Sequence, residues 1–274
     1  MSLKDRIIIT GLTDQGVVRD HNEDTIGNNA DLGLAVPADG MGGHKSGEVA
    51  SALAVDTILS SLSESLKDIV ISDIDENTGY TLGSIAVENA IKSANSVIYQ
   101  ASCKNKHYEG MGTTIVVLLF YDNRFTVAHV GDSRLYRSRD NQLQLLTRDH
   151  TLLQELVDRG LYTKEEARES TKKNLVTRAV GVNDTVEVDI TEDTAAVNDI
   201  YLLCSDGLND MIEDSLIEDT INNYHSDLGK IATELVKQAK QHGGKDNVSA
   251  LLAQPVKPFP AGGNWINKIT DLFS

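Results

Sequence analysis

The 274-residue sequence predicts an α+β fold in which antiparallel sheets are covered by helices on their outer sides. Strand-like runs outnumber helical runs, and the two kinds are grouped along the chain instead of alternating strictly, which disfavours a doubly wound parallel sheet. Residues 113–120 (TTIVVLLF) are continuously apolar and β-branched, as expected of a strand covered on both faces. No Pro/Gly/Ser-rich linker and no internal repeat divides the chain, so we expect one domain.

Four further segments are predicted to be strands: 32–38, 125–130, 200–205 and 248–253. The polar residues 121–124 between two apolar runs are typical of a hairpin connection. Pro37 has no amide proton, so we expect it at a sheet edge or a strand end. Counting in twos from Ile200 predicts that Asp206 lies on the same strand face as Cys204.

Helices are predicted over 46–62 and 80–101, and a third apolar face is formed by Ile231, Leu235, Val236 and Ala239. Ser46 is a suitable N-cap and Glu48 suits the first turn. Residues 152–181 carry many charges and little apolar stripe. We predict a short helix there, a turn at Gly160, a second short helix and an irregular segment. This segment is either a mobile flap beside a site or an ordinary solvated excursion.

Composition excludes several classes of function. The net charge of −16 disfavours nonspecific binding to nucleic acid or to an anionic membrane surface, and an acidic solubilising surface explains it equally well. Two distant cysteines form neither a disulfide framework nor a zinc pattern, so we expect a reduced, cytoplasmic setting with Cys204 in the core. No run reaches the length of a membrane span, and no signal peptide is recognisable. A monomer is the default expectation.

Acidic residues beside glycine or in acidic pairs recur in short segments that adjoin the predicted strands. They are Glu23-Asp24, Asp39-Gly40, Gly131-Asp132, Asp206-Gly207 and Asp246-Asn247. Each alone is also explained by a common turn or by solvated charge. Several carboxylates that converge would suit hard, oxygen-preferring cations such as Mg²⁺ or Mn²⁺ and metal-assisted hydrolysis.

Other candidates are weighed against simpler interpretations. Arg19 is either an ion-pair partner of the acidic groups or a ligand for a phosphate group. The loop 40–47 contains several glycines but fails the spacing of a dinucleotide fingerprint and of a P-loop. His129 falls within a strand pattern and is expected to be a core residue, whereas His44 in the glycine loop is worth testing.

Taken together, these segments resemble the metal-dependent protein phosphatase family, the type 2C (PPM) serine/threonine phosphatases, in their bacterial form. The resemblance runs from about Gly11 to Ala253 and rests on short motifs in order: DQGVVRDHNED from Asp14, ADGMGGHKSGE from Ala38, MGTT from Met111, VGDSR from Val130, LTRDH from Leu146, TRAVG from Thr177, CSDGL from Cys204 and GKDNV from Gly244. It implies a four-layer α/β-β/α sandwich of two packed antiparallel sheets flanked by helices. It also implies a catalytic domain over residues 1–254 with a flap at about 151–181.

The resemblance implies a site with two Mn²⁺ or Mg²⁺ ions. Asp39 would bridge them, Gly40 would offer its carbonyl, and Asp206 and Asp246 their carboxylates. The remaining expected roles belong to Glu23 and Asp24 (ligands, directly or through water), Asp132 (a third, weaker metal with Asp206) and Arg19 (substrate phosphate). A hydroxide bridging the two ions would attack phosphoserine or phosphothreonine in line.

The resemblance leaves some points open. Met41 stands where eukaryotic relatives carry a histidine proposed as the leaving-group acid, so we expect a metal-bound water in that role, with His44 a weaker candidate. Phosphorylated proteins are the implied partners, and a serine/threonine kinase would be the opposing enzyme. Alternatives are a phosphatase dedicated to one regulator, such as a sigma-factor antagonist system, or an inactive phosphoprotein-binding module. The tail 255–274 carries apolar residues at helical spacing and is expected to cap the domain, contact a partner or touch a membrane surface.

Overall fold

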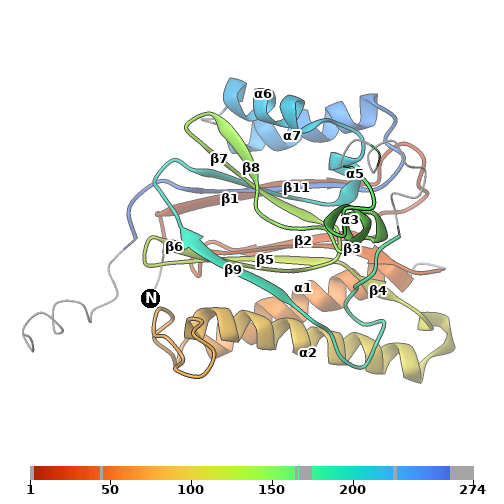
Figure 1. Cartoon of the computed structure of the whole chain (residues 1–274), viewed down its shortest axis with the longest axis horizontal. Coiled ribbons are helices and arrows are strands. Elements are labelled where there is room, and N and C mark those ends of the chain that lie inside the picture. The colour runs from red at the N-terminus through yellow and green to blue at the C-terminus, as the bar shows by residue number, and fades with distance from the viewer. Residues whose placement is uncertain (1–2, 44–45, 164–165, 167–174, 225–226, 260–274) are drawn as a thin grey trace, which may run out of the picture.

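The computed structural model describes residues 3–43, 46–163, 166, 175–224 and 227–259. Two antiparallel sheets pack face to face, and helices cover the outer face of each (Figure 1). The predicted α+β class and the four-layer α/β-β/α arrangement are confirmed. Among the described residues, no helix is long and apolar enough to cross a membrane.

The first sheet has the strand order β1-β11-β10-β7-β8. Its strands are β1 (Ile7–Asp14), β11 (Val248–Pro255), β10 (Ile200–Cys204), β7 (Arg134–Arg139) and β8 (Gln142–Leu145). The second sheet has the order β2-β3-β5-β6-β9, with β4 paired to β3. Its strands are β2 (Asp24–Asn29), β3 (Leu34–Met41), β4 (Gly112–Thr113), β5 (Ile115–Tyr121), β6 (Arg124–Val130) and β9 (Asp189–Thr194).

Two long helices cover the second sheet and two others cover the first (Figure 1). These are α1 (Ser46–Ser65) and α2 (Leu82–Lys104) on one side, and α6 (Asp214–Tyr224) and α7 (Leu228–Gln241) on the other. Short pieces are α3 (Leu152–Asp158), α5 (Asp206–Asn209) and the 3₁₀ turn Lys106–Tyr108. Gly160 follows α3 with a φ of +69°, as the predicted turn requires. The predicted second short helix of that region falls largely outside the described residues.

Strand β5 contributes side chains to two hydrophobic clusters, one on each face of its sheet. Val117 and Leu119 pack toward α1 and α2, while Val116, Leu118 and Phe120 pack between the two sheets. The prediction that this run is covered on both faces is therefore confirmed. Ring contacts bind the sheets together at the centre, where the ring centroids of Phe120 and Tyr201 lie 5.0 Å apart in an edge-to-face arrangement.

The hairpin between β5 and β6 is also confirmed. Asp122 and Asn123 have φ values of 45° and 55°, the left-handed pair that a tight two-residue turn needs.

Two predictions about strands are wrong. Pro37 lies inside β3, between β2 and β5, and is tolerated because β3 pairs with β5 only at Leu34 and Ala35. Asp206 does not continue the face of β10, because the strand ends at Cys204 and Asp206 begins α5.

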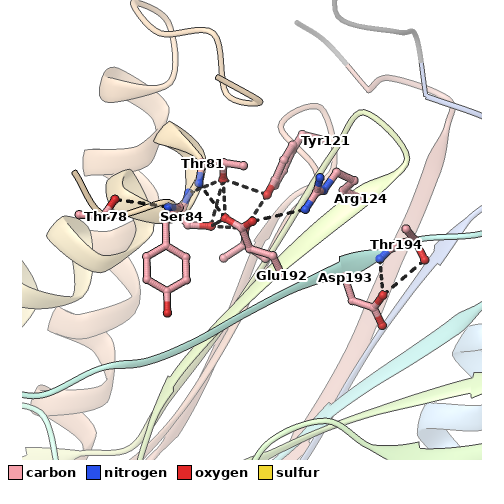
Figure 2. A network of polar contacts seen from close by, with 10 residues as sticks. Thr78, Thr81, Ser84, Tyr121, Arg124, Glu192, Asp193 and Thr194 are labelled. Atoms are coloured by element: carbon pink, nitrogen blue, oxygen red, sulfur yellow. Dashed lines mark hydrogen bonds and ion pairs between the residues drawn. The ribbon is translucent and has the colours of Figure 1, made fainter. Parts of the chain in front are cut away.

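A partly buried carboxylate, Glu192, connects β9 to the start of α2 (Figure 2). Glu192 Oε1 accepts hydrogen bonds from the Thr81 amide at 2.9 Å, the Thr81 hydroxyl at 2.9 Å and the Ser84 hydroxyl at 2.5 Å. Its Oε2 lies 3.4 Å from Arg124 Nη2. Thr81 is the N-cap of α2, so the negative charge lies at the helix terminus that favours it. The pKa of Glu192 is lowered, because these hydrogen bonds outweigh the effect of burial.

Candidate metal centre

Five aspartates converge where strands of both sheets end. Asp39 lies near the end of β3, and Asp24, the first residue of β2, is its partner in the ladder. Asp132 follows β6, Asp206 opens α5 directly after β10, and Asp246 precedes β11. These elements lie near the labels α5 and β3 in Figure 1. The structure thus assembles carboxylates that are up to 222 positions apart, from Asp24 to Asp246, into one region.

The electrostatics show how closely these groups interact. Burial raises the pKa of Asp39 well above its ordinary value, and repulsion from Asp24, Asp206, Asp132 and Asp246 raises it further. The pKa of Asp206 is raised in the same way, by burial and then by Asp132 and other acids of the cluster. Without cations, the protein holds negative charge here at a cost in folding free energy.

Two aspartates of the cluster have a pKa of about 6. For Asp24 the main cause is burial, which hydrogen bonds from Ser249 and Ser205 partly offset. For Asp132 burial is again the largest cause, followed by repulsion from Asp149. Asp149 is itself held by Arg134, whose Nη2 lies 2.7 Å from its Oδ2.

Glycines allow the backbone segments of the centre to touch. A Cβ at Gly40 would lie 2.1 Å from the carbonyl oxygen of Gly47, and a Cβ at Gly207 would lie 1.9 Å from that of Asn247. No side chain fits at such distances, so packing requires glycine at both positions. The amide of Gly40 donates to the carbonyl of Glu23 at 3.2 Å, which joins the β3 end to the segment before β2.

Arg19 and Glu23 lie at the rim of the cluster. Arg19 Nη2 is 2.6 Å from Asp246 Oδ2, and its side chain is half exposed. The sequence left open whether Arg19 is an ion-pair partner or a phosphate ligand, and in this structure it pairs with Asp246. Glu23 Oε1 lies 3.2 Å from His21 Nε2. Asn247 connects these pieces, since its Oδ1 accepts from the Glu23 amide and its Nδ2 donates to the carbonyl of His21.

The donor atoms fit divalent cations. Within the described ranges, Asp24 Oδ1 and Asp206 Oδ1 are buried and have no hydrogen-bond partner. A buried carboxylate oxygen without a donor requires a proton or a cation. Because all these donors are oxygen atoms, the set suits Mg²⁺ or Mn²⁺ better than softer metals.

A second group has metal-ligand spacing but a different explanation. Ligand atoms of His129, His150 and Asp189 lie within 4.8 Å of one another. The amide of Gly131 donates to His150 Nδ1 at 3.1 Å, so the proton of the neutral ring is on Nε2, facing Asp189. This tautomer leaves no lone pair on Nε2 for a metal. His129 is buried, with Nε2 2.8 Å from the Arg148 carbonyl, and the prediction of a core histidine is confirmed.

One predicted candidate cannot be placed at the centre, and three residues that contact the centre were not predicted. His44 lies outside the described residues. The sequence analysis missed Ser205, Ser249 and Thr114, which contact the cluster: both serines donate to Asp24, and the Thr114 hydroxyl accepts from the Asp39 amide. A signal was present for Ser249, because it is a lone polar residue in the apolar run that follows Asn247.

Comparison with known proteins identifies the class that this fold and centre define. Residues 16–253 match the protein phosphatase 2C family, and the chain belongs to that family. It is 35% identical over 245 residues to the serine/threonine phosphatase stp of Listeria welshimeri, covering 88% of this chain and 93% of that protein. It is 39% identical over 244 residues to the serine/threonine protein phosphatase PstP of Mycobacterium tuberculosis, covering 89% of this chain and 44% of that longer protein.

Solved structures agree. The crystal structure of the Mycobacterium tuberculosis phosphatase PstP/Ppp superposes with a TM-score of 0.80 at 35% identity, covering 90% of this chain and 98% of that chain. The catalytic domain of PstP in complex with two manganese ions gives a TM-score of 0.77 at 35% identity, with 92% and 99% covered.

Proposed function

We propose that this chain removes phosphate from phosphoserine and phosphothreonine in proteins, with two Mn²⁺ or Mg²⁺ ions in the acidic centre. The observation that carries the proposal is the pair of buried carboxylate oxygens without partners, Asp24 Oδ1 and Asp206 Oδ1, on two aspartates whose pKa values are raised by burial. Family membership and the names of the relatives support the phosphatase activity.

Each residue then has a role. Asp39, the carbonyl of Gly40, Asp206 and Asp246 hold the two ions, with Asp39 shared between them. When bound, two such cations lower the pKa of a water molecule and offset charge on the phosphoryl oxygens. Glu23 and Asp24 act as ligands directly or through water, and Asp132 with Asp206 provides a weaker third position. These assignments fit the way the other aspartates of the cluster raise the pKa of Asp39.

Arg19 binds the substrate phosphate in this proposal. Its guanidinium is half exposed and is held at the rim by Asp246, so it can offer its remaining N–H groups to an incoming phosphate. Met41 follows Asp39-Gly40 in β3, and its thioether has no proton to give. The leaving alkoxide therefore takes its proton from water at the centre, unless His44 supplies it.

The domain boundaries and the biological role are inferred from the same activity. We infer that the catalytic domain spans 1–254, with residues 151–181 as a flap beside the centre and 255–274 as a C-terminal tail. The start of that tail packs with the domain, because Pro255 ends β11 and Phe259 contacts Phe120 in the core, while 260–274 lie outside the described residues. A bacterial cytoplasmic protein that acts as a monomer in signal transduction, opposing a serine/threonine kinase, fits the bacterial phosphatases to which it is similar.

The test is hydrolysis of p-nitrophenyl phosphate and of a phosphothreonine peptide with Mn²⁺, with EDTA, and with Asp206→Asn. We expect Mn²⁺-dependent phosphate release that EDTA and Asp206→Asn each abolish. Asp193→Asn is the matched control, because Asp193 pairs with Arg137 and lies opposite Phe125, at the far end of β6 from Asp132. A folded wild-type protein that binds Mn²⁺ but releases no phosphate would contradict the proposal and indicate a binding module.

A further inference from the structure

Two hydroxyl groups converge on a single oxygen of Asp24. Ser205 Oγ and Ser249 Oγ donate to Asp24 Oδ2 at 2.8 and 2.7 Å, and both serines are almost fully buried. Asp24 belongs to β2 of the second sheet, whereas Ser249 belongs to β11 of the first sheet and Ser205 directly follows β10. The contact therefore fastens the two sheets together at the acidic centre.

The direction of each hydrogen bond follows from proton counting. A hydroxyl has one proton, and an ionised carboxylate only accepts, so both serines must direct their proton to Asp24. Thr13 Oγ1, 2.8 Å from Ser249 Oγ, is a second acceptor for the Ser249 proton, but the charged carboxylate of Asp24 is the stronger acceptor. Thr13 Oγ1 itself also accepts from Asn22 Nδ2 at 2.8 Å. Ser205 Oγ accepts the Ser249 amide proton at 3.0 Å, so the Ser205 hydroxyl is oriented by a donor behind it.

The Ser205 side chain does not cap the helix that follows it. It is the N-cap residue of α5, a position where serine commonly accepts a hydrogen bond from the first turn of the helix. In this structure its side chain makes no capping bond. Its oxygen accepts the Ser249 amide proton instead, and its own proton goes to Asp24.

These contacts leave one oxygen of Asp24 for a ligand. Oδ2 is occupied by two hydroxyls, while Oδ1 is buried without a partner, and Asp24 lies opposite Asp39 in the β2–β3 ladder. We propose that Ser205 and Ser249 are positioning residues that orient Asp24 and thereby strengthen divalent-cation binding at the centre. The inference rests on the proposed function, because the cation is the one that the phosphatase activity requires.

The experiment measures the Kd for Mn²⁺ of the full chain by isothermal titration calorimetry after EDTA treatment and removal of the chelator. We expect Ser249→Ala and Ser205→Ala each to raise the Kd about 10-fold or more, as loss of groups that orient metal ligands commonly does. Ser249→Thr keeps the hydroxyl and is expected to bind Mn²⁺ close to the wild-type Kd.

Ser84→Ala is the matched control, because Ser84 also donates from a buried hydroxyl to a carboxylate, the partly buried Glu192, away from the centre (Figure 2). It should lower the melting temperature and leave the Kd unchanged. If the alanine variants do not fold, Ser249→Cys keeps a side chain of similar size with a weaker donor and should raise the Kd by a smaller factor.

The outcomes separate the two proposals. Wild-type protein that does not bind Mn²⁺ would overturn the proposed function and this inference together. Wild-type protein that binds Mn²⁺ and is active, with unchanged Kd in both alanine variants, would overturn only the positioning role. An equal rise in Kd for Ser249→Ala and Ser249→Thr would also overturn it, because packing and not the hydroxyl would then control binding.

Discussion

The acidic centre and the Glu192 network differ in whether their carboxylates have hydrogen-bond donors. Glu192 has a donor for each oxygen, and its pKa is lowered despite burial. Asp39 and Asp206 are surrounded by other acids, their pKa values are raised, and Asp206 Oδ1 has no partner. The chain can therefore supply hydrogen-bond donors for a partly buried carboxylate from its own groups. Where it does not, the missing partner is best explained as a cation from outside.

The largest effect is expected from Asp39→Asn. It should lower kcat/KM for a phosphothreonine peptide by more than about 100-fold, beyond what loss of groups behind the ligands costs. In EDTA the same variant should melt at a higher temperature than the wild type, because one repelling charge is removed. Thermal melts with and without EDTA, together with steady-state kinetics, check both results.

Glu192→Gln tests the other side of that comparison. We expect kcat/KM to stay near the wild-type value. A variant pair in which Asp39→Asn destabilises the metal-free protein as much as Glu192→Gln does would show that the two centres do not differ in the way described.

Arg19, beside the acidic centre, and Arg124, beside Glu192, extend the comparison to arginine side chains. Arg19→Ala should lower kcat/KM about 10- to 100-fold, the equivalent of one or two hydrogen bonds to a charged group, with a rise in KM. Arg19→Lys should recover only part of the loss, because an ammonium group lacks the planar fork. Arg124, which pairs with Glu192, supplies the control: Arg124→Ala should leave phosphopeptide kinetics unchanged. Equal losses in the Arg19 and Arg124 variants would contradict a phosphate-binding role.

Among these substitutions, the largest loss of folding stability is expected at Glu192, the carboxylate whose two oxygens both have donors. Glu192→Gln should lower the free energy of unfolding by about 2 kcal/mol, because three donors lose a charged acceptor. Urea unfolding at neutral pH measures the change. Asp193→Asn is a neighbouring control on the same strand, where the carboxylate is 43% exposed and a smaller loss is expected.

The fold could be predicted from local patterns wherever an element is apolar and long. The β5–β6 hairpin and the class of fold follow from such runs, whereas β9 could not be recognised from its sequence, DITEDT. Pairing with β6 holds that polar segment in a strand, so tertiary context overrides propensity. Pro37 was misplaced for a related reason, since the gap in the β3–β5 ladder is not visible in the sequence.

The acidic centre was predictable only as a set of residues. The carboxylates were visible because Asp-Gly pairs follow apolar runs, and the structure brings them together, while their roles as ligands stay predictions. The serines that orient Asp24 are 181 and 225 positions away from it in the chain, so no local spacing connects them to it. Ser249 stands out as a lone polar residue in an apolar run, but nothing in the sequence indicates which group it contacts.

The broadest effect is the pH dependence of stability in the absence of metal. Asp24 and Asp132 have a pKa of about 6 in the folded protein against an ordinary value of 3.8. The folded state therefore binds these protons more tightly than the unfolded state, and stability should fall as pH rises from about 4 to about 6, by up to about 1.4 kcal/mol per unit of pKa difference. Glu192 acts in the opposite direction, and its contribution is lost only below its ordinary pKa of 4.5.

Thermal melts between pH 4.5 and 7.5 test this difference between the centres. In EDTA we expect the melting temperature to fall as pH rises, a slope that Glu192→Gln retains and Asp132→Asn reduces. With excess Mn²⁺ the slope should reverse, because the ions compete with protons for the same carboxylates and bind more tightly as pH rises. A metal-free protein whose melting temperature rises throughout this range would contradict the raised pKa values, and with them the argument that the centre is built for cations.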